Sequence, residues 1–245
     1  MIRRMLALAM ALLLLTTGSA GAAGVLAGSG VADHYDTGMA CFYLEQYQSA
    51  VQHFRSAGNY QDAKKWAYYC EAIHMVMTAS GSQALEQAQA RELYAAILVH
   101  DSIERCLACS GRTSLLESAD AVRRRRGNAS LPASDLYETG MNYYFLENYA
   151  TAADYFCLAG NYSDARQWRC FCTAVELVTA NGSISDAQIL FDLLEAQGFA
   201  AAKDWVVYCR AREYESMRLH SNAISLYKTI FVHDSSERYL QLSNK

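Results

Sequence analysis

The strongest constraint on this chain is an internal duplication. The segment from Tyr35 to Val76 aligns without gaps on the segment from Tyr137 to Val178, and 19 positions are identical. Chance would give about two or three identities, so the two segments are copies of one unit. A chain built from copies of one unit is restricted to folds in which that unit is repeated.

A shorter signature returns five times along the chain. It consists of an aromatic residue or valine, one further residue, Asp, Ala or Ser, six residues and Cys. It starts at Tyr60, Val99 and Tyr162, and in a weaker form at Phe199 and Val232. Three of the four intervals between copies have the length of one helical hairpin, and the longest contains a spacer.

Composition favours helix throughout. Alanine, leucine and tyrosine are abundant, and the only proline is Pro132, so very little interrupts helix formation. Long alternating runs of β-branched residues, which would indicate strands, are absent. We therefore predict an all-α fold with two repeat blocks, residues 33–110 and 134–245, which are joined by a spacer at residues 111–133.

Small and aromatic residues recur at a fixed spacing. In three segments a small residue precedes an alanine by 12 positions, and an aromatic residue follows that alanine by four. The three sets are Gly38, Ala50 and Phe54; Gly140, Ala152 and Phe156; and Ala211, Ala223 and Tyr227.

This arrangement resembles the tetratricopeptide repeat, in which two antiparallel helices approach at small residues while an aromatic ring fills the gap. The resemblance implies an α-solenoid of antiparallel helical hairpins. Two features depart from the family pattern. Thr37 and Thr139 stand where the family has its Trp-x2-Leu start, and Asp62 and Asp164 take the place of its usual proline.

The N-terminus has the features of a secretory signal peptide. Arg3 and Arg4 precede an apolar core, and Ala20–Ala22 supplies an A-x-A cleavage pattern. The core spans about ten residues, which is short of the roughly 20 that cross a bilayer. We predict a signal peptide at residues 1–22, a linker at 23–32, and a protein that is secreted or held in the cell envelope. An uncleaved membrane anchor is the alternative.

The charge of the chain argues against nucleic-acid binding. The formal net charge is −4, and the segment before Gly24 contributes +2 through Arg3 and Arg4, so the remainder carries −6. The only basic run is Arg123–Arg126, which we interpret as a solvated helix end or linker. Four like charges could instead contact an anionic wall polymer or lipid headgroup.

Eight cysteines in an exported chain would normally indicate disulfides. Four of them occupy the last position of the repeated signature, where the fifth copy has Leu242, so we predict a small buried apolar site there. These four are Cys70, Cys109, Cys172 and Cys209. A local disulfide between some pair remains open.

Cys106 and Cys109 form a C-x-x-C pair with His100 nearby, and a thiol or metal site there is a remote alternative. A tetrahedral zinc site needs a second pair of ligands, and the sequence shows none. Motifs of nucleophilic, phosphate-binding or zinc-protease sites are also missing. We predict a protein that is not an enzyme and has no cofactor and no metal.

The remaining candidate site is a stripe of aromatic residues and methionines in each block. A spacing of four places each set of three on one face of a helix. The resemblance implies that this face lines the concave groove and binds an apolar or aromatic peptide. The alternative is that the stripe packs against a neighbouring helix. The six residues are Tyr35, Met39, Tyr43, Tyr137, Met141 and Phe145.

These observations predict an exported scaffold that binds a protein or peptide partner. The alternative is a structural or oligomerising protein of the cell envelope that buries the stripe between its own helices. Solvent exposure of Tyr43 and Phe145 distinguishes the two. We expect no nucleic-acid partner, and contact with a membrane only if the signal segment stays attached.

Overall fold

The protein is described by a computed structural model that covers residues 30–79, 83–97, 99, 101–127, 131–180 and 182–244. Across these residues it contains thirteen α-helices, two short 3-10 helices and no strand. The prediction of an all-α solenoid-like repeat fold is confirmed. The predicted signal peptide lies outside the described residues.

The helices form two compact units that divide after Gly111. Unit 1 contains α2 (Val31–Tyr43), α3 (Tyr47–Ala57), α4 (Ala63–Thr78), α5 (Gln83–Ala95) and α6 (Ser102–Cys109). Unit 2 contains η1 (Thr113–Leu115), α7 (Ala119–Arg126), α8 (Ala133–Phe145), α9 (Tyr149–Ala159), α10 (Ala165–Thr179), α11 (Ile184–Ala196), η2 (Ala200–Ala202), α12 (Lys203–Ser216), α13 (His220–Tyr227) and α14 (Ser235–Ser243).

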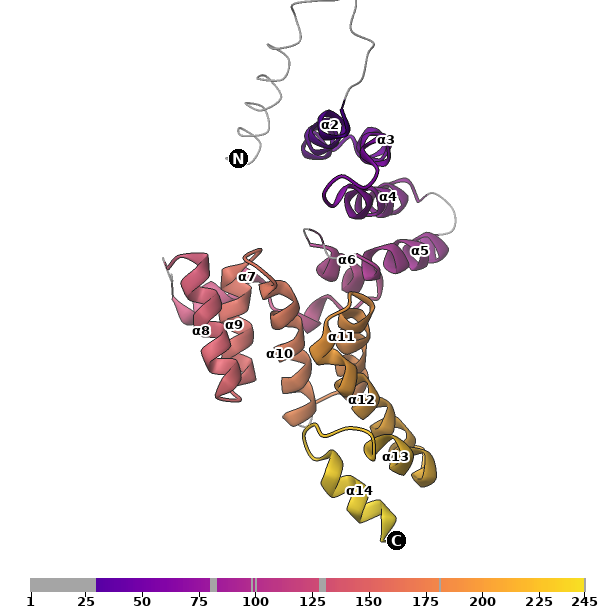
Figure 1. Ribbon diagram of the computed structural model, residues 1–245, viewed down its shortest axis with the longest axis vertical. Helices are drawn as coiled ribbons and strands as arrows, with labels where there is room; N and C mark the ends of the chain where they lie inside the picture. Colours follow the sequence, from indigo (N-terminus) through magenta and orange to yellow (C-terminus); the bar gives the residue numbers. More distant parts are fainter. Residues whose placement is uncertain are drawn as a thin grey trace, which may run out of the picture. The chain divides into compact units, whose positions relative to one another are not determined.

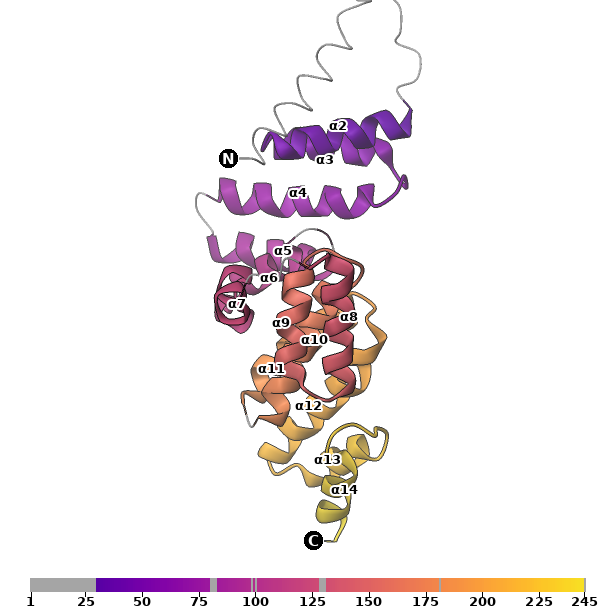
Figure 2. The same cartoon turned by 90° about the vertical axis from the view of Figure 1, so that its left-hand side faces the viewer.

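Within each unit, helices that follow one another in sequence pack side by side as antiparallel hairpins (Figure 1, Figure 2). The five hairpins are α2/α3 and α4/α5 in unit 1, and α8/α9, α10/α11 and α12/α13 in unit 2. The last described helix of each unit packs on the hairpin before it, α6 on α5 in unit 1 and α14 on α13 in unit 2. Each unit is thus a row of hairpins.

All five hairpins share one core. The first helix carries an aromatic residue three positions before a buried Gly or Ala, and the second carries a buried Ala four positions before an aromatic residue. The two rings meet edge to face, with centroids 5.5 to 5.9 Å apart and planes at 61 to 69°. Such ring pairs stabilise a core beyond the area they bury. They are Tyr35–Phe54, Tyr69–Tyr94, Tyr137–Phe156, Phe171–Phe191 and Tyr208–Tyr227.

Two of the small residues must be glycine. A Cβ at Gly38 would lie 2.8 Å from the ring of Phe54, and one at Gly140 would lie 2.8 Å from the ring of Phe156. Both distances are below van der Waals contact, so the helices of these hairpins approach closely only because the side chain is absent.

A tyrosine on the first helix of one hairpin binds an aspartate at the start of the next hairpin. The hydroxyls of Tyr35, Tyr137 and Tyr208 donate over 2.6 Å to signature aspartates. Tyr69 does the same in unit 1. Each aspartate precedes the first residue of its helix, so the signature aspartate connects successive hairpins. The pairs are Tyr35–Asp62, Tyr69–Asp101, Tyr137–Asp164 and Tyr208–Asp234.

The signature copy that starts at Phe199 lacks this hydrogen bond because both partners differ. Ala201 occupies the aspartate position, and Phe171, which aligns with Tyr69 in the duplication, occupies the tyrosine position. The Phe171 ring instead contacts Phe199, with the ring centroids 5.7 Å apart. Both members of the pair thus differ together at this copy: the polar tyrosine and aspartate are absent, and apolar residues take their places. A tyrosine here without the aspartate would have a buried hydroxyl with no acceptor.

The residue four positions after the signature aspartate is also coupled to its surroundings. Trp66 and Trp168 donate their indole N–H to the aspartate over 3.1 Å and stack on the phenylalanine of the preceding helix. In α6 and α14 this residue is an arginine, Arg105 or Arg238, which donates to the signature aspartate at the start of the same helix. The helix before each of them has a tyrosine where α3 and α9 have phenylalanine. In α6 and α14 an arginine therefore takes the place that tryptophan has in α4 and α10.

Candidate functional site

The six predicted groove residues have two kinds of surroundings. Tyr35, Met39, Tyr137 and Met141 are half-buried, whereas the side chains at the end of each stripe are exposed. Tyr35 and Tyr137 hold the signature aspartates and pack on the core phenylalanines. Their position gives these two tyrosines a structural task within the hairpin.

Tyr43 and Phe145 end their helices with 48% and 73% of their surface exposed. Each is followed by a leucine that also faces solvent, Leu44 at 44% and Leu146 at 74%. The predicted stripe did not include the two leucines, although the Leu-Glu step is identical in both copies of the duplication. Each turn thus presents two adjacent apolar side chains.

Aromatic rings that reach into the core support each exposed ring. Tyr43 contacts Phe42, with centroids 5.4 Å apart, and Phe42 packs on Trp66 at 4.9 Å. In unit 2, Phe145 contacts Tyr144 at 5.4 Å, and Tyr144 packs on a tryptophan at 4.7 Å. Each exposed ring is therefore in contact with a ring that packs on a tryptophan of the same unit.

Unit 2 carries a further feature, which the described residues of unit 1 do not repeat. Residues 112–126, which we call the strap, lie within the predicted spacer and pack on helices α9, α10 and α11 of unit 2. At one end Arg112 pairs with Asp186 of α11, and in the middle Arg169 of α10 donates to the backbone carbonyl of Glu117. At the other end α7 packs on α9.

The contact between α7 and α9 centres on Asp154, whose side chain is only 8% exposed. Arg125 donates to one carboxylate oxygen of Asp154, and Arg126 Nε lies 2.7 Å from the other. Arg126 also donates to the Thr151 hydroxyl over 2.9 Å, and Arg125 pairs with Glu117 at 2.7 Å. The hydrogen bonds to Asp154 and Glu117 raise the pKa of Arg125, so it stays charged. The basic run is thus only partly a solvated helix end.

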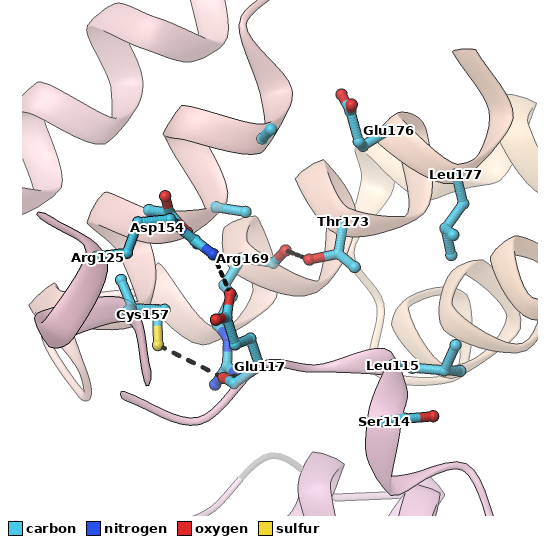
Figure 3. A pocket seen from close by; sticks show the side chains of 13 residues that line it. Ser114, Leu115, Glu117, Arg125, Asp154, Cys157, Arg169, Thr173, Glu176 and Leu177 are labelled. Atoms are coloured by element: carbon cyan, nitrogen blue, oxygen red, sulfur yellow. Dashed lines mark hydrogen bonds and ion pairs between the residues drawn. The ribbon is translucent and has the colours of Figure 1, made fainter. Parts of the chain in front are cut away.

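A cavity of about 240 Å³ lies between the strap and helices α9 and α10 (Figure 3). Its lining mixes charged, polar and apolar side chains, and the strap forms one wall of it. The lining residues are Ser114, Leu115, Glu117, Val122, Arg125, Ala150, Ala153, Asp154, Cys157, Arg169, Thr173, Glu176 and Leu177.

The cysteines are held as free thiols. Cys70, Cys172 and Cys209 of the signature are fully buried, as predicted. Leu242, which takes the same position in the fifth copy, is buried as well. Burial raises the pKa of Cys70 to about 12, which keeps its thiol protonated and unreactive. Cys109 is an exception because it is only half-buried. It is the last residue of α6, and no later helix of unit 1 covers it.

The C-x-x-C pair does not have the environment of a reactive thiol. Burial is the main cause that raises the pKa of Cys106 to about 11, and it also raises the pKa of Cys109. His100 lies outside the described residues. The described residues bring no three His, Cys, Asp or Glu side chains together in a way that could hold a metal ion. Nor does any helix in the described ranges have the length and apolarity to cross a membrane.

The fold and these surfaces define the class as an all-α helical-repeat protein. Comparisons of the chain with protein families, with curated protein sequences and with solved structures found no match.

Proposed function

We propose that this protein is a non-catalytic scaffold that binds a protein or peptide partner through the α2–α3 and α8–α9 turns. The observation that carries the proposal is the exposed apolar pair at the same turn in both copies of the duplicated block, Tyr43–Leu44 and Phe145–Leu146. Single exposed apolar residues are common on proteins, but adjacent ones that recur at one structural position indicate a binding surface.

The chemistry of the turns supports a partner with apolar and basic groups. Glu45 and Glu147 follow the apolar pairs directly and are exposed. Aromatic side chains supply large contact areas in interfaces at a low cost in side-chain entropy, particularly where neighbouring rings already restrict them. The surrounding carboxylates would orient a positively charged partner.

The hairpin core supports placing the chain beside the tetratricopeptide repeats as a divergent relative, since the small and aromatic residues occupy the matching positions. Many repeat proteins of this type act by presenting one extended surface to another molecule. The apolar segment near the N-terminus supports a site of action outside the cytoplasm, either secreted or in the cell envelope.

The competing function is a structural or oligomerising protein of the envelope. In that case the same two turns would contact a second copy of this chain, and the half-buried members of each stripe would serve packing alone. The two functions differ in the identity of the molecule that covers Tyr43 and Phe145.

The test compares Tyr43→Ala and Phe145→Ala with four control variants in melting experiments and in affinity capture from the native host. The exposed-site variants should weaken partner capture and change stability by no more than about 1 kcal/mol. Tyr68→Ala and Phe231→Ala remove aromatic rings that are 47% and 87% exposed at other positions, and they should leave capture unchanged.

Two core controls calibrate the stability measurement. Phe54→Ala and Phe156→Ala remove fully buried rings and should cost about 3–5 kcal/mol each. If Tyr43→Ala and Phe145→Ala destabilise the protein as strongly as these controls, or leave partner capture unchanged, the proposal is wrong.

A further inference from the structure

The strap occupies its place on unit 2 in the manner of a bound ligand. We propose that its docking site on α9 is a recognition site for a helical segment of another protein, in which an apolar residue is followed by two arginines at the third and fourth positions after it. The strap fills this site as an internal ligand. The site uses different residues from the turns of the proposed function, so each proposal can fail without the other.

The strap presents one compact motif to α9. Val122 is only 2% exposed, and Arg125 and Arg126 follow it by three and four positions. Residues with this spacing lie on the same face of a helix. Both arginines bind Asp154, and Arg126 reaches Thr151 as well. The motif therefore consists of one apolar anchor and a pair of guanidinium groups.

The receptor surface requires a positively charged occupant. With the strap in place Asp154 is almost fully buried, and a carboxylate covered in this way is strongly destabilising unless cations pair with it. Ala150 and Ala153 have short side chains beside Asp154, so a helix can approach α9 closely at this point. A segment without arginine would leave the Asp154 charge uncompensated, and the site therefore selects by charge.

The duplication shows that the repeat fold itself does not require this receptor. In unit 1 the positions that correspond to Ala150, Asp154 and Cys157 hold Gln48, Gln52 and Arg55. These three side chains of α3 are long, polar and exposed. The repeat helix α3 thus has long, polar side chains at these positions, whereas its copy α9 has small residues and a buried acid.

The strap also leaves space in its groove. The cavity of about 240 Å³ is bounded by Glu117 of the strap, by Asp154 and by Arg169 (Figure 3). An internal ligand that fills the groove incompletely can be displaced by a segment that fills it better. The open volume beside the charged contacts gives a competing segment room for additional side chains.

The test uses a fluorescently labelled synthetic peptide with the sequence of residues 112–126 and the full-length protein. In wild-type protein the tethered strap should exclude the peptide. In the double variant Arg125→Ala/Arg126→Ala the internal strap loses its hydrogen bonds to Asp154 and Thr151. The peptide should then bind at least tenfold more tightly than to wild type. Adding Asp154→Asn to the double variant should abolish this gain, and a peptide with alanine at both arginine positions should not bind.

Circular dichroism of each variant completes the experiment. Equal binding of the peptide to all variants, or no binding to any of them, overturns the proposal. Loss of helical signal in the double variant and also in the milder Arg126→Ala would show that the strap is an integral part of the fold. That outcome likewise contradicts the proposal.

Discussion

The Tyr69–Asp101 pair allows a direct test of how successive hairpins are joined. Unit 2 has already replaced the equivalent pair by Phe171 and Ala201. We therefore predict that Tyr69→Phe and Asp101→Ala are each destabilising alone and that the double variant costs less than the sum of the two. The loss of the Asp101–Arg105 ion pair remains in both variants that lack Asp101. The hydroxyl of Tyr69 donates to the Asp101 carboxylate, and the tyrosine side chain is fully buried.

The magnitude follows from this burial. A hydrogen bond to a charged group contributes about 1.5–3 kcal/mol, so Tyr69→Phe should cost that amount. Asp101→Ala leaves the buried hydroxyl without its acceptor, which costs about 1–3 kcal/mol. When both groups are replaced, the second loss no longer applies. The coupling energy in a double-mutant cycle should therefore be about 1.5–3 kcal/mol.

The assay must report on unit 1 alone, because two units need not unfold together. Trp66 is the only tryptophan of unit 1. Replacing Trp168 and Trp205 by phenylalanine leaves its fluorescence as the signal for urea unfolding of that unit. If the effects of the two single variants add within about 0.5 kcal/mol, the pair is not coupled and the explanation of the signature copy at Phe199 is wrong.

Three further predictions concern the core. Gly38→Ala and Gly140→Ala should each destabilise the protein by about 1–3 kcal/mol, because the new methyl group overlaps the ring of Phe54 or Phe156; unchanged melting curves would contradict this close approach. Burial and the hydrogen bond to Asp164 raise the pKa of Tyr137 from its ordinary value of 10.0 to about 12. The stability that this neutral phenol contributes is fully present below pH 10 and is lost as the pH rises towards 12, so Tyr137→Phe should weaken the loss of stability over that range in alkaline unfolding. Differential alkylation should modify the half-buried Cys41 and Cys109 well before Cys70, Cys172 and Cys209; a disulfide between Cys70 and Cys109 would refute the packing role.

The hairpin core could be predicted from sequence where its spacing is regular. Small residue, alanine and aromatic ring lie within one hairpin, so a constant turn length keeps the interval of 12 visible. In the α4/α5 hairpin the interval runs from Ala72 to Ala90, and in α10/α11 it runs from Ala174 to Ala187. Both intervals are longer than 12 positions. The same core contacts were therefore hidden by the longer turns in these two hairpins.

Burial within the candidate stripe could not be predicted from its spacing. A period of four places Tyr35 and Tyr43 on one helix face, but only the three-dimensional fold brings Asp62 to the hydroxyl of Tyr35. The contact that Arg125 and Arg126 make with α9 could not be predicted either, because it depends on a residue far away in the sequence. Asp154 lies 28 positions after Arg126, and no local pattern connects them.

The most direct test of the binding function is site-specific photo-crosslinking in the native host. A photoreactive phenylalanine analogue replaces Tyr43 or Phe145, and Tyr68 and Phe231 serve as exposed control positions. The account predicts that the two turn positions form adducts with the same protein partner and that the control positions do not. Adducts only with a second copy of this chain, or equal labelling at all four positions, would contradict it.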